Sequence, residues 1–154
     1  LDELIKARLE RCLIERVEQG NELQQLQHPK LDVSLAKVTV IGRKKHWILL
    51  LTSLINNAIE FQRADIKAEI AIRLVLANDG KTVSLLIEDN GIGVPVSALA
   101  GLSKPFSSTV KQEAPNRLGM GLSYCARIAE LNQADLHFGE SRLGGFKVEY
   151  KFSI

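Results

Sequence analysis

The sequence has few of the features that mark membrane-spanning, disulfide-stabilised or nucleic-acid-binding proteins. Its longest apolar run, Trp47 to Leu51, is far shorter than the roughly 18–20 residues that a transmembrane helix needs. Its two cysteines, Cys12 and Cys125, lie far apart, which supports neither a disulfide framework nor a zinc site and fits a reducing compartment. Twenty basic against 18 acidic residues leave a formal net charge of +2, too balanced for a nucleic-acid-binding surface. We therefore expect a cytoplasmic chain with no nucleic-acid partner.

What the chain does contain is enough apolar sequence for one core. Of its 154 residues 45% are hydrophobic and 25% are charged, and this length is typical of a single domain. We expect residues 1–154 to form that domain. The chain begins at Leu1 without an initiating methionine, so we expect it to be a fragment. Any membrane anchor or sensor part of the full-length protein would then lie outside it.

Three segments have the apolar spacing of amphipathic helices. The clearest is 43–61, where one face repeats at i, i+3, i+4 and i+7 through Trp47, Leu50, Leu51, Leu54, Ile55 and Ala58. Residues 2–19 and 122–131 have shorter versions of this pattern. On the first of these helices a rotation of about 100° per residue places Ser53, Asn57 and Glu60 on one polar stripe beside the apolar face.

Alternating apolar residues predict strands in the rest of the chain. Segments 70–76 and 83–87 form a hairpin around Asn78-Asp79-Gly80, and a strand at 136–138 pairs with 146–154 across residues 141–145. Short strands are also expected at 21–27, 32–35 and 37–41. Antiparallel strands with helices on one face predict an α+β protein, a two-layer α/β sandwich with a mixed, mostly antiparallel sheet.

Three separate segments carry residues suited to a nucleotide site. Asn57, inside the clearest helix, offers a neutral oxygen ligand for a cation such as Mg²⁺, although it is also explained as a boundary asparagine that bonds backbone. Asp89 ends a strand before Gly91 and Gly93, where a carboxylate can accept a hydrogen bond from a purine amine; an ordinary turn after a strand has the same pattern. Gly119-Met120-Gly121 precedes a helix whose N-terminus suits a phosphate, or is a plain helix cap.

The order and spacing of these segments resemble the ATP-binding catalytic domain of sensor histidine kinases. That domain belongs to a wider group with gyrase-type topoisomerases, a heat-shock chaperone and mismatch-repair ATPases. The segment Lys104 to Thr109 (KPFSST) resembles the F box of the kinase branch. The resemblance covers essentially the whole chain.

The resemblance implies ATP and Mg²⁺ as cofactors, with Asn57 as the catalytic residue and metal ligand and Asp89 as the reader of the adenine amine. The nucleotide-binding residues that it implies are Asn57, Asp89, Gly91, Gly93, Lys104, Thr109, Lys111, Arg117, Gly119, Gly121 and Leu122. It also implies that residues 94–118 form an ATP lid, which we expect to be the most mobile part of the domain without nucleotide.

The sequence departs from the family pattern at three positions. Ser53 stands where the family has Asn or Glu, and the ATPase branches use that Glu to activate water. Glu60 stands where a basic residue is common, and Arg117 where a glycine is expected. Either the phosphate contacts move to Lys104, Lys111 or Arg117, or they are partly missing.

The implied function is transfer of the γ-phosphoryl group of ATP to a histidine on another domain. None of His28, His46 and His137 is followed by the acidic residue and proline of the family's phosphoacceptor box, so we expect each to be structural or exposed. The implied partners are the dimerisation and histidine-phosphotransfer domain of the same kinase, homodimeric in full length, and a response regulator. Two alternatives are an ATP-hydrolysing clamp, which Ser53 and the F box oppose, and a non-catalytic interaction module.

Overall fold

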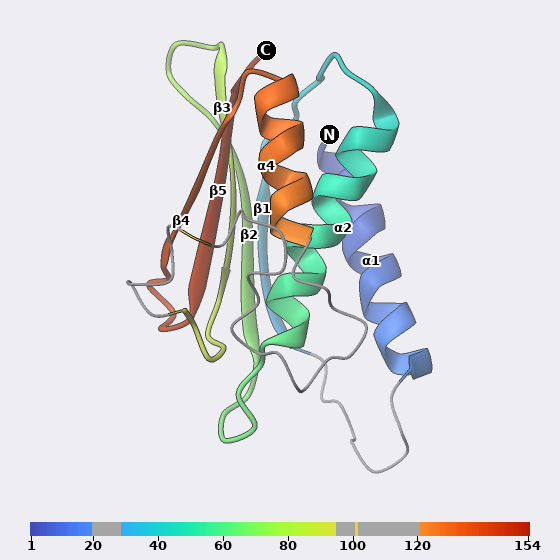
Figure 1. Cartoon of the computed structure of the whole chain (residues 1–154), viewed down its shortest axis with the longest axis vertical. Helices are drawn as coiled ribbons and strands as arrows, with labels where there is room; N and C mark the ends of the chain where they lie inside the picture. Colours follow the sequence, from blue (N-terminus) through green and yellow to red (C-terminus); the bar gives the residue numbers. More distant parts are fainter. Residues whose placement is uncertain (20–28, 95–100, 102–120) are drawn as a thin grey trace.

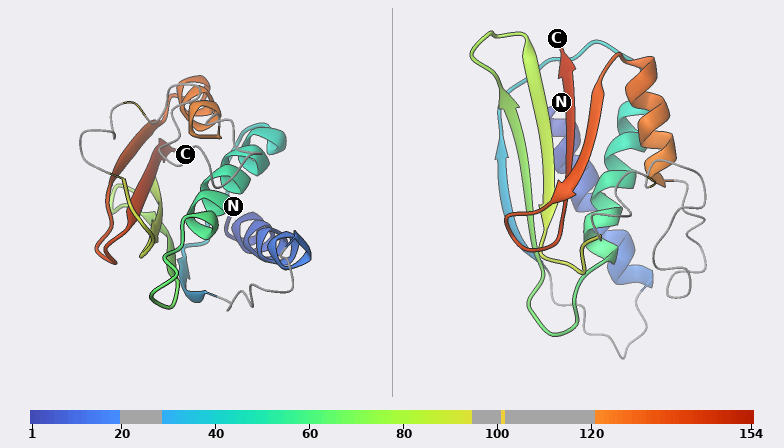
Figure 2. Two further views of the ribbon diagram at one scale, coloured as in Figure 1. Left: turned by 60° about the horizontal axis from the view of Figure 1, so that its bottom comes forward. Right: turned by 60° about the vertical axis from the view of Figure 1, so that its left-hand side comes forward.

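The computed structural model describes residues 1–19, 29–94, 101 and 121–154, which form two layers (Figure 1). Helices α1 (Asp2–Gln19), α2 (Lys44–Glu60) and α4 (Gly121–Leu131) cover one face of the sheet. The five strands are β1 (Lys30–Leu35), β2 (Glu69–Leu76), β3 (Thr82–Asp89), β4 (Asp135–Glu140) and β5 (Phe146–Ser153). Figure 2 shows the separation between the sheet and the helices in two further views.

The sheet is mixed and mostly antiparallel, as the sequence predicts. Its strand order is β1-β2-β3-β5-β4, and only β1 and β2 are parallel neighbours. A parallel pair needs a long crossover, and α2 provides it between these two strands. Both predicted hairpins are confirmed. In the first, Asp79 Oδ1 accepts hydrogen bonds from the amides of Lys81 and Thr82, each at 2.8 Å, and Gly80 has a φ of 66°.

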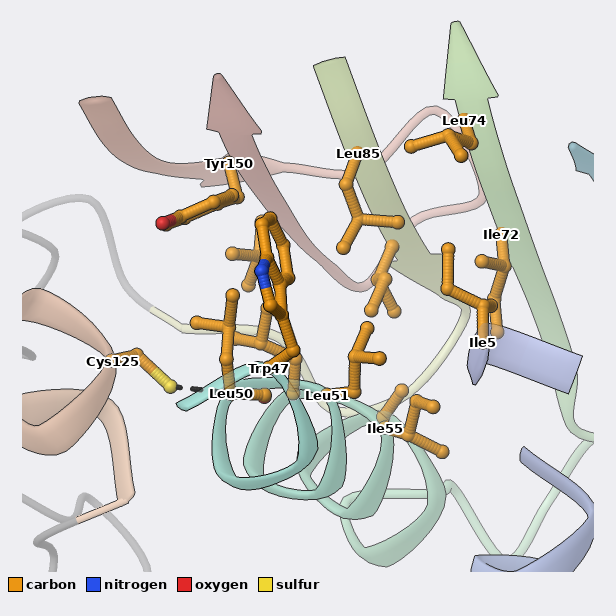
Figure 3. Close-up of a cluster of buried hydrophobic side chains, with 14 of the residues drawn as sticks. Ile5, Trp47, Leu50, Leu51, Ile55, Ile72, Leu74, Leu85, Cys125 and Tyr150 are labelled. Carbon is orange, nitrogen blue, oxygen red and sulfur yellow. Dashed lines mark hydrogen bonds between the residues drawn. The ribbon is translucent and has the colours of Figure 1, made fainter. Parts of the chain in front are cut away.

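The core lies between the helices and the sheet (Figure 3). Every apolar residue on the predicted face of α2 is buried. Trp47 joins α2 to β5, because its ring meets the rings of Tyr150 at 5.8 Å and Phe152 at 5.1 Å, both edge to face. Trp47 is therefore a core residue, as its helical spacing predicts. The inner faces of β2 and β3 contribute alternate residues, among them Ile72 and Leu85.

The prediction of a strand at 37–41 is wrong. This segment connects β1 to the start of α2 across the end of the sandwich (Figure 1), so it has no neighbouring strand. Its alternating pattern reflects packing instead: Val38 is buried and Val40 packs partly against the core, whereas Ile41 is fully exposed. The strand expected at 32–35 is longer and begins at Lys30. The strand expected at 21–27 lies outside the described residues.

Among the described residues, none of the helices is both long and apolar enough to cross a bilayer.

Candidate nucleotide site

Asp89 ends β3 as a buried carboxylate with only 4% of its surface exposed. Its Oδ1 accepts hydrogen bonds from two backbone amides, Gly91 at 2.9 Å and Phe146 at 3.1 Å. Its main-chain oxygen accepts a third, from the amide of Gly145 at 3.1 Å. No donor from the described residues reaches Oδ2. The backbone therefore orients the carboxylate through one oxygen and leaves the other as an acceptor.

Burial raises the pKa of Asp89 from 3.8 to about 6, and the two amides that bond Oδ1 lower it by less. The reason is that desolvation disfavours the charged form of a carboxyl, whereas hydrogen bonds to the carboxylate favour it. A ligand that donates a hydrogen bond to Oδ2 would favour the charged form further.

Asn90 fixes the position of the end of β3. Its Oδ1 accepts a hydrogen bond from the Glu69 amide and its Nδ2 donates one to the Lys67 carbonyl, both at 2.8 Å. Its own amide donates to the Glu69 carbonyl at 3.2 Å. These three bonds tie the residue after Asp89 to the start of β2, so the carboxylate lies on a well-anchored strand end.

The loop after β3 packs on the end of α2. The amide of Ile92 donates to the carbonyl of Phe61 at 3.0 Å, and a Cβ built on Gly91 would lie 2.1 Å from that same oxygen. Gly91 is therefore required by a backbone contact inside the protein, a reason separate from the access of a purine to the backbone. Gly93 has a φ of 69°, in the left-handed region that favours glycine.

Asn57 and Ser53 lie one turn apart on α2. Asn57 is nearly buried, with 9% of its surface exposed. Ser53 faces α4, since a Cβ built on Gly121 would lie 3.9 Å from its Cβ and 4.0 Å from its hydroxyl oxygen. The N-terminus of α4 therefore lies against the same helix that carries Asn57. Leu122, the second residue of α4, packs partly against the core.

The elements that carry these residues meet toward one end of the sandwich, drawn at the bottom of Figure 1. Strand β3 and helix α2 both end there, and α4 begins on that side. Five of the nucleotide-binding residues predicted from sequence lie outside the described part of the chain: Lys104, Thr109, Lys111, Arg117 and Gly119. The predicted F box and most of the predicted lid lie outside it too.

The structure adds a group of residues that the sequence motifs do not include, the turn 141–145 between β4 and β5. Its last residue, Gly145, packs directly on Asp89: a Cβ there would lie 2.3 Å from Asp89 Oδ1 and 2.6 Å from its main-chain oxygen. The Gly144-Gly145 pair was a signal in the sequence, but it indicated only a hairpin turn. Its contact with residue 89 is a long-range one.

Two of the three histidines lie in the described residues. His46 is half-buried in the first turn of α2 and His137 is exposed on β4, the strand at one edge of the sheet. His28 lies outside the described residues.

Comparison with known proteins agrees with this geometry. Residues 42–154 match the family model described as "Histidine kinase-, DNA gyrase B-, and HSP90-like ATPase". The sensor protein QseC of Escherichia coli K12 is 28% identical over 127 residues, which make up 80% of this chain but 26% of QseC. The chain thus spans about a quarter of the length of this relative.

Solved structures with the same fold include a sensor histidine kinase and a protein solved with bound AMPPNP. The mycobacterial sensor histidine kinase MprB superposes with a TM-score of 0.80 at 17% identity, covering 98% of this chain and 93% of that one. Full-length ShkA in complex with AMPPNP gives a TM-score of 0.72 at 19% identity, covering 98% of this chain and 29% of ShkA. Because the family model covers most of the chain and the fold agrees, this chain belongs to the family of histidine kinase-, DNA gyrase B- and HSP90-like ATPases.

Proposed function

We propose that this chain is the ATP-binding catalytic domain of a two-component sensor histidine kinase, with residues 1–154 as one domain. It would transfer the γ-phosphoryl group of ATP to a histidine on the dimerisation and histidine-phosphotransfer domain of the same protein. A response regulator would then receive the group. The kinase branch is favoured by the relatives, which include a sensor protein, and by Ser53 in place of a water-activating carboxylate. The domain would work on the cytoplasmic side, where ATP is, with any membrane anchor elsewhere in the full-length protein.

The observation that carries this proposal is the oriented carboxylate of Asp89. Two backbone amides hold Oδ1, and Oδ2 has no donor from the described residues. The exocyclic amine of adenine is a donor of the right kind for this oxygen. Gly91 and Gly93 follow Asp89 without side chains, so that the base can approach the backbone. We infer that Asp89 selects adenine.

The residues near the N-terminus of α4 suit the phosphates. A helix N-terminus presents backbone N–H groups and the positive end of its dipole, and this one begins at Gly121 and Leu122. Gly119, Lys104, Thr109, Lys111 and Arg117 are proposed as further phosphate contacts.

Asn57 fits a role as a ligand for Mg²⁺. Its carboxamide oxygen is a neutral hard ligand and would not add negative charge beside phosphates. The described residues hold no group of three His, Cys, Asp or Glu side chains that could hold a metal ion. A magnesium ion here would thus take its other ligands from phosphate and water, as is common for this ion. Its chemistry would be charge neutralisation on the transferred group.

The chain's own groups position the reactants. Position 53 carries a serine hydroxyl in place of a carboxylate that could remove a proton from water. A neutral imidazole needs no base to act as nucleophile, so positioning and charge neutralisation are sufficient. We therefore expect the isolated domain to bind nucleotide but to hydrolyse it very slowly.

Calorimetric titration with Mg²⁺ and ADP tests the proposal. We expect saturable binding to the unmodified chain, binding reduced at least tenfold in Asp89→Asn, and a loss in Asn57→Ala that shrinks when Mg²⁺ is omitted. Arg11→Ala, which alters an exposed ion pair on α1, is the control and should bind as the unmodified chain does. Absence of binding at millimolar ADP would favour a non-catalytic interaction module.

A further inference from the structure

A buried acidic side chain lies next to Asp89 on the opposite face of the sheet. Side chains alternate along a strand, so Ile87 and Asp89 face the helices and Glu88 faces away from them. On that face Glu88 lies in a row with Ala71 of β2 and Asp32 of β1. Glu88 is only 5% exposed, although no helix covers this face in the described residues. A carboxylate buried to this degree requires a partner.

Arg142, from the turn 141–145, is that partner. Its Nε donates to Glu88 Oε2 at 3.1 Å, and its backbone amide lies 3.4 Å from Glu88 Oε1. A terminal nitrogen of the same guanidinium lies 3.9 Å from an Asp32 carboxylate oxygen. Because the residue between Asp32 and Glu88 in the row is Ala71, the guanidinium has room to reach across β2. Arg142 therefore connects β1, β3 and the turn.

Hydrogen bonds within the turn 141–145 hold its residues together, so a displacement of one residue shifts the others. The Gly144 amide donates to the Ser141 carbonyl, the Ser141 amide to the Gly145 carbonyl, and the Leu143 amide to Ser141 Oγ, each at 2.9 Å. The side chain of Ser141 is buried.

Two consecutive residues of β3 thus hold the same turn from opposite faces of the sheet. Glu88 bonds Arg142 on the outer face, while Asp89 bonds the amides of Gly145 and Phe146 on the inner side. Figure 2 shows the connection between β4 and β5 beside the end of β3.

We propose that Arg142 and Glu88 are positioning residues for adenine recognition. Their ion pair holds the turn 141–145 against β3, and the backbone at the end of this turn orients the Asp89 carboxylate. Neither side chain touches the nucleotide. This inference rests on the proposed function, since it takes Asp89 as the group that reads the base.

The test compares ADP with inosine diphosphate, which has an oxygen in place of the exocyclic amine. In the unmodified chain ADP should bind at least tenfold more tightly. In Arg142→Ala the affinity for ADP should fall about fivefold to tenfold, the factor expected for one weakened hydrogen bond, whereas the affinity for inosine diphosphate should change less than about twofold. Glu88→Gln, which keeps an acceptor, should have a smaller effect in the same direction.

A merely structural role would lower both affinities equally, and this result would overturn the proposal. So would an unchanged preference for ADP in Arg142→Ala. Arg142→Lys keeps the charge but loses the Nε donor, so its affinity for ADP should lie between those of the unmodified chain and Arg142→Ala. It replaces Arg142→Ala in the test if that variant folds poorly. Arg11→Ala, in an exposed ion pair on α1, is the matched control and should leave both affinities unchanged.

Failure of the proposed function has a different signature. An unmodified chain that binds neither nucleotide, or both equally, would refute adenine reading by Asp89 and with it the role of Arg142. Amide exchange measured by NMR gives a second readout without nucleotide: exchange at Phe146 should accelerate in Arg142→Ala and not in Arg11→Ala. Unchanged exchange there would contradict the proposal.

Discussion

Asp89 is costly to the fold in the state without nucleotide, because its carboxylate is charged at neutral pH in a buried position. Burial raises the pKa of this carboxyl from its ordinary value of 3.8 to about 6 in the folded domain. A raised carboxyl pKa means that the protonated form is favoured by folding. The stability that Asp89 contributes through this preference is complete below pH 3.8 and is lost as the pH rises through about 6. The residue that would read adenine therefore weakens the empty domain at neutral pH.

We predict that Asp89→Asn raises the free energy of unfolding without nucleotide by about 1–3 kcal/mol at pH 7.5. The amide keeps an oxygen acceptor for the Gly91 and Phe146 amides and carries no charge. Urea denaturation at pH 7.5 and at pH 4 measures the effect, which should shrink at the lower pH. Asp135→Asn, which changes an exposed carboxylate at the start of β4, is the control for removal of a charge. A destabilised Asp89→Asn variant would contradict the account of Asp89 as a buried charge that lowers the stability of the domain.

Nucleotide binding should depend on the same ionisation. Two amides occupy Oδ1, so a proton on the carboxyl would lie on Oδ2 and present a donor to the adenine amine, which is also a donor. We predict that ADP affinity rises by about tenfold from pH 5 to pH 7 with a midpoint near 6. Phosphate ionisation also changes in this range, so the measure is the ratio of affinities between the unmodified chain and Asp89→Asn. A ratio independent of pH would exclude a role for this ionisation.

At the scale of the elements, the turn 141–145 tolerates no side chain at its last residue. A side chain at Gly145 would collide with both the carboxylate and the main-chain oxygen of Asp89, and backbone atoms cannot move aside cheaply. Gly139 in β4 is different, since a Cβ there would meet only the end of the Lys147 side chain at 3.6 Å, an ordinary contact distance.

We predict that Gly145→Ala lowers the free energy of unfolding by about 2–4 kcal/mol and lowers ADP affinity at least tenfold, whereas Gly139→Ala changes either one little. Thermal unfolding and ADP titration of both variants measure this. If Gly145→Ala kept the affinity of the unmodified chain, the contact between the turn and Asp89 would not matter for binding.

The elements that the sequence predicts well are those with a strong local signal. Helix α2 follows from six apolar residues at helical spacing, and the β2–β3 hairpin from alternation around Asn78-Asp79-Gly80. The segment 37–41 misled because a connection that packs alternate residues on the core has the same pattern as a strand. Only its position, across the end of the sandwich, distinguishes the two.

The residues of the candidate site likewise divide into those that a local sequence signal reveals and those that only the fold brings together. Asp89, Gly91 and Gly93 stand out in the sequence because a strand runs into them, and their nucleotide roles remain predictions. The reasons for two glycines did not stand out. Gly91 avoids the Phe61 carbonyl and Gly145 avoids Asp89, and both contacts join residues far apart in the chain. Arg142 and Glu88 meet 54 positions apart for the same reason, and no spacing rule could pair them.

At the scale of the whole molecule, the sandwich gathers the ends of β3 and α2, the start of α4 and the turn 141–145 on one side. This arrangement suits a domain that holds ATP at an edge and presents its γ-phosphoryl group to a second protein. The relatives are much longer than this chain, and the acceptor histidine would belong to the remainder.

The most direct test of the central claim is transfer of phosphate from radiolabelled ATP in the presence of Mg²⁺. The chain is incubated alone and with a separately purified dimerisation domain that carries a phosphoacceptor histidine. We predict acid-labile label on the acceptor domain, lost in Asp89→Asn and in Asn57→Ala, with little label on the chain and little free phosphate without the acceptor. Rapid phosphate release by the chain alone would instead indicate a clamp ATPase, and stoichiometric label on His28, His46 or His137 would contradict the account.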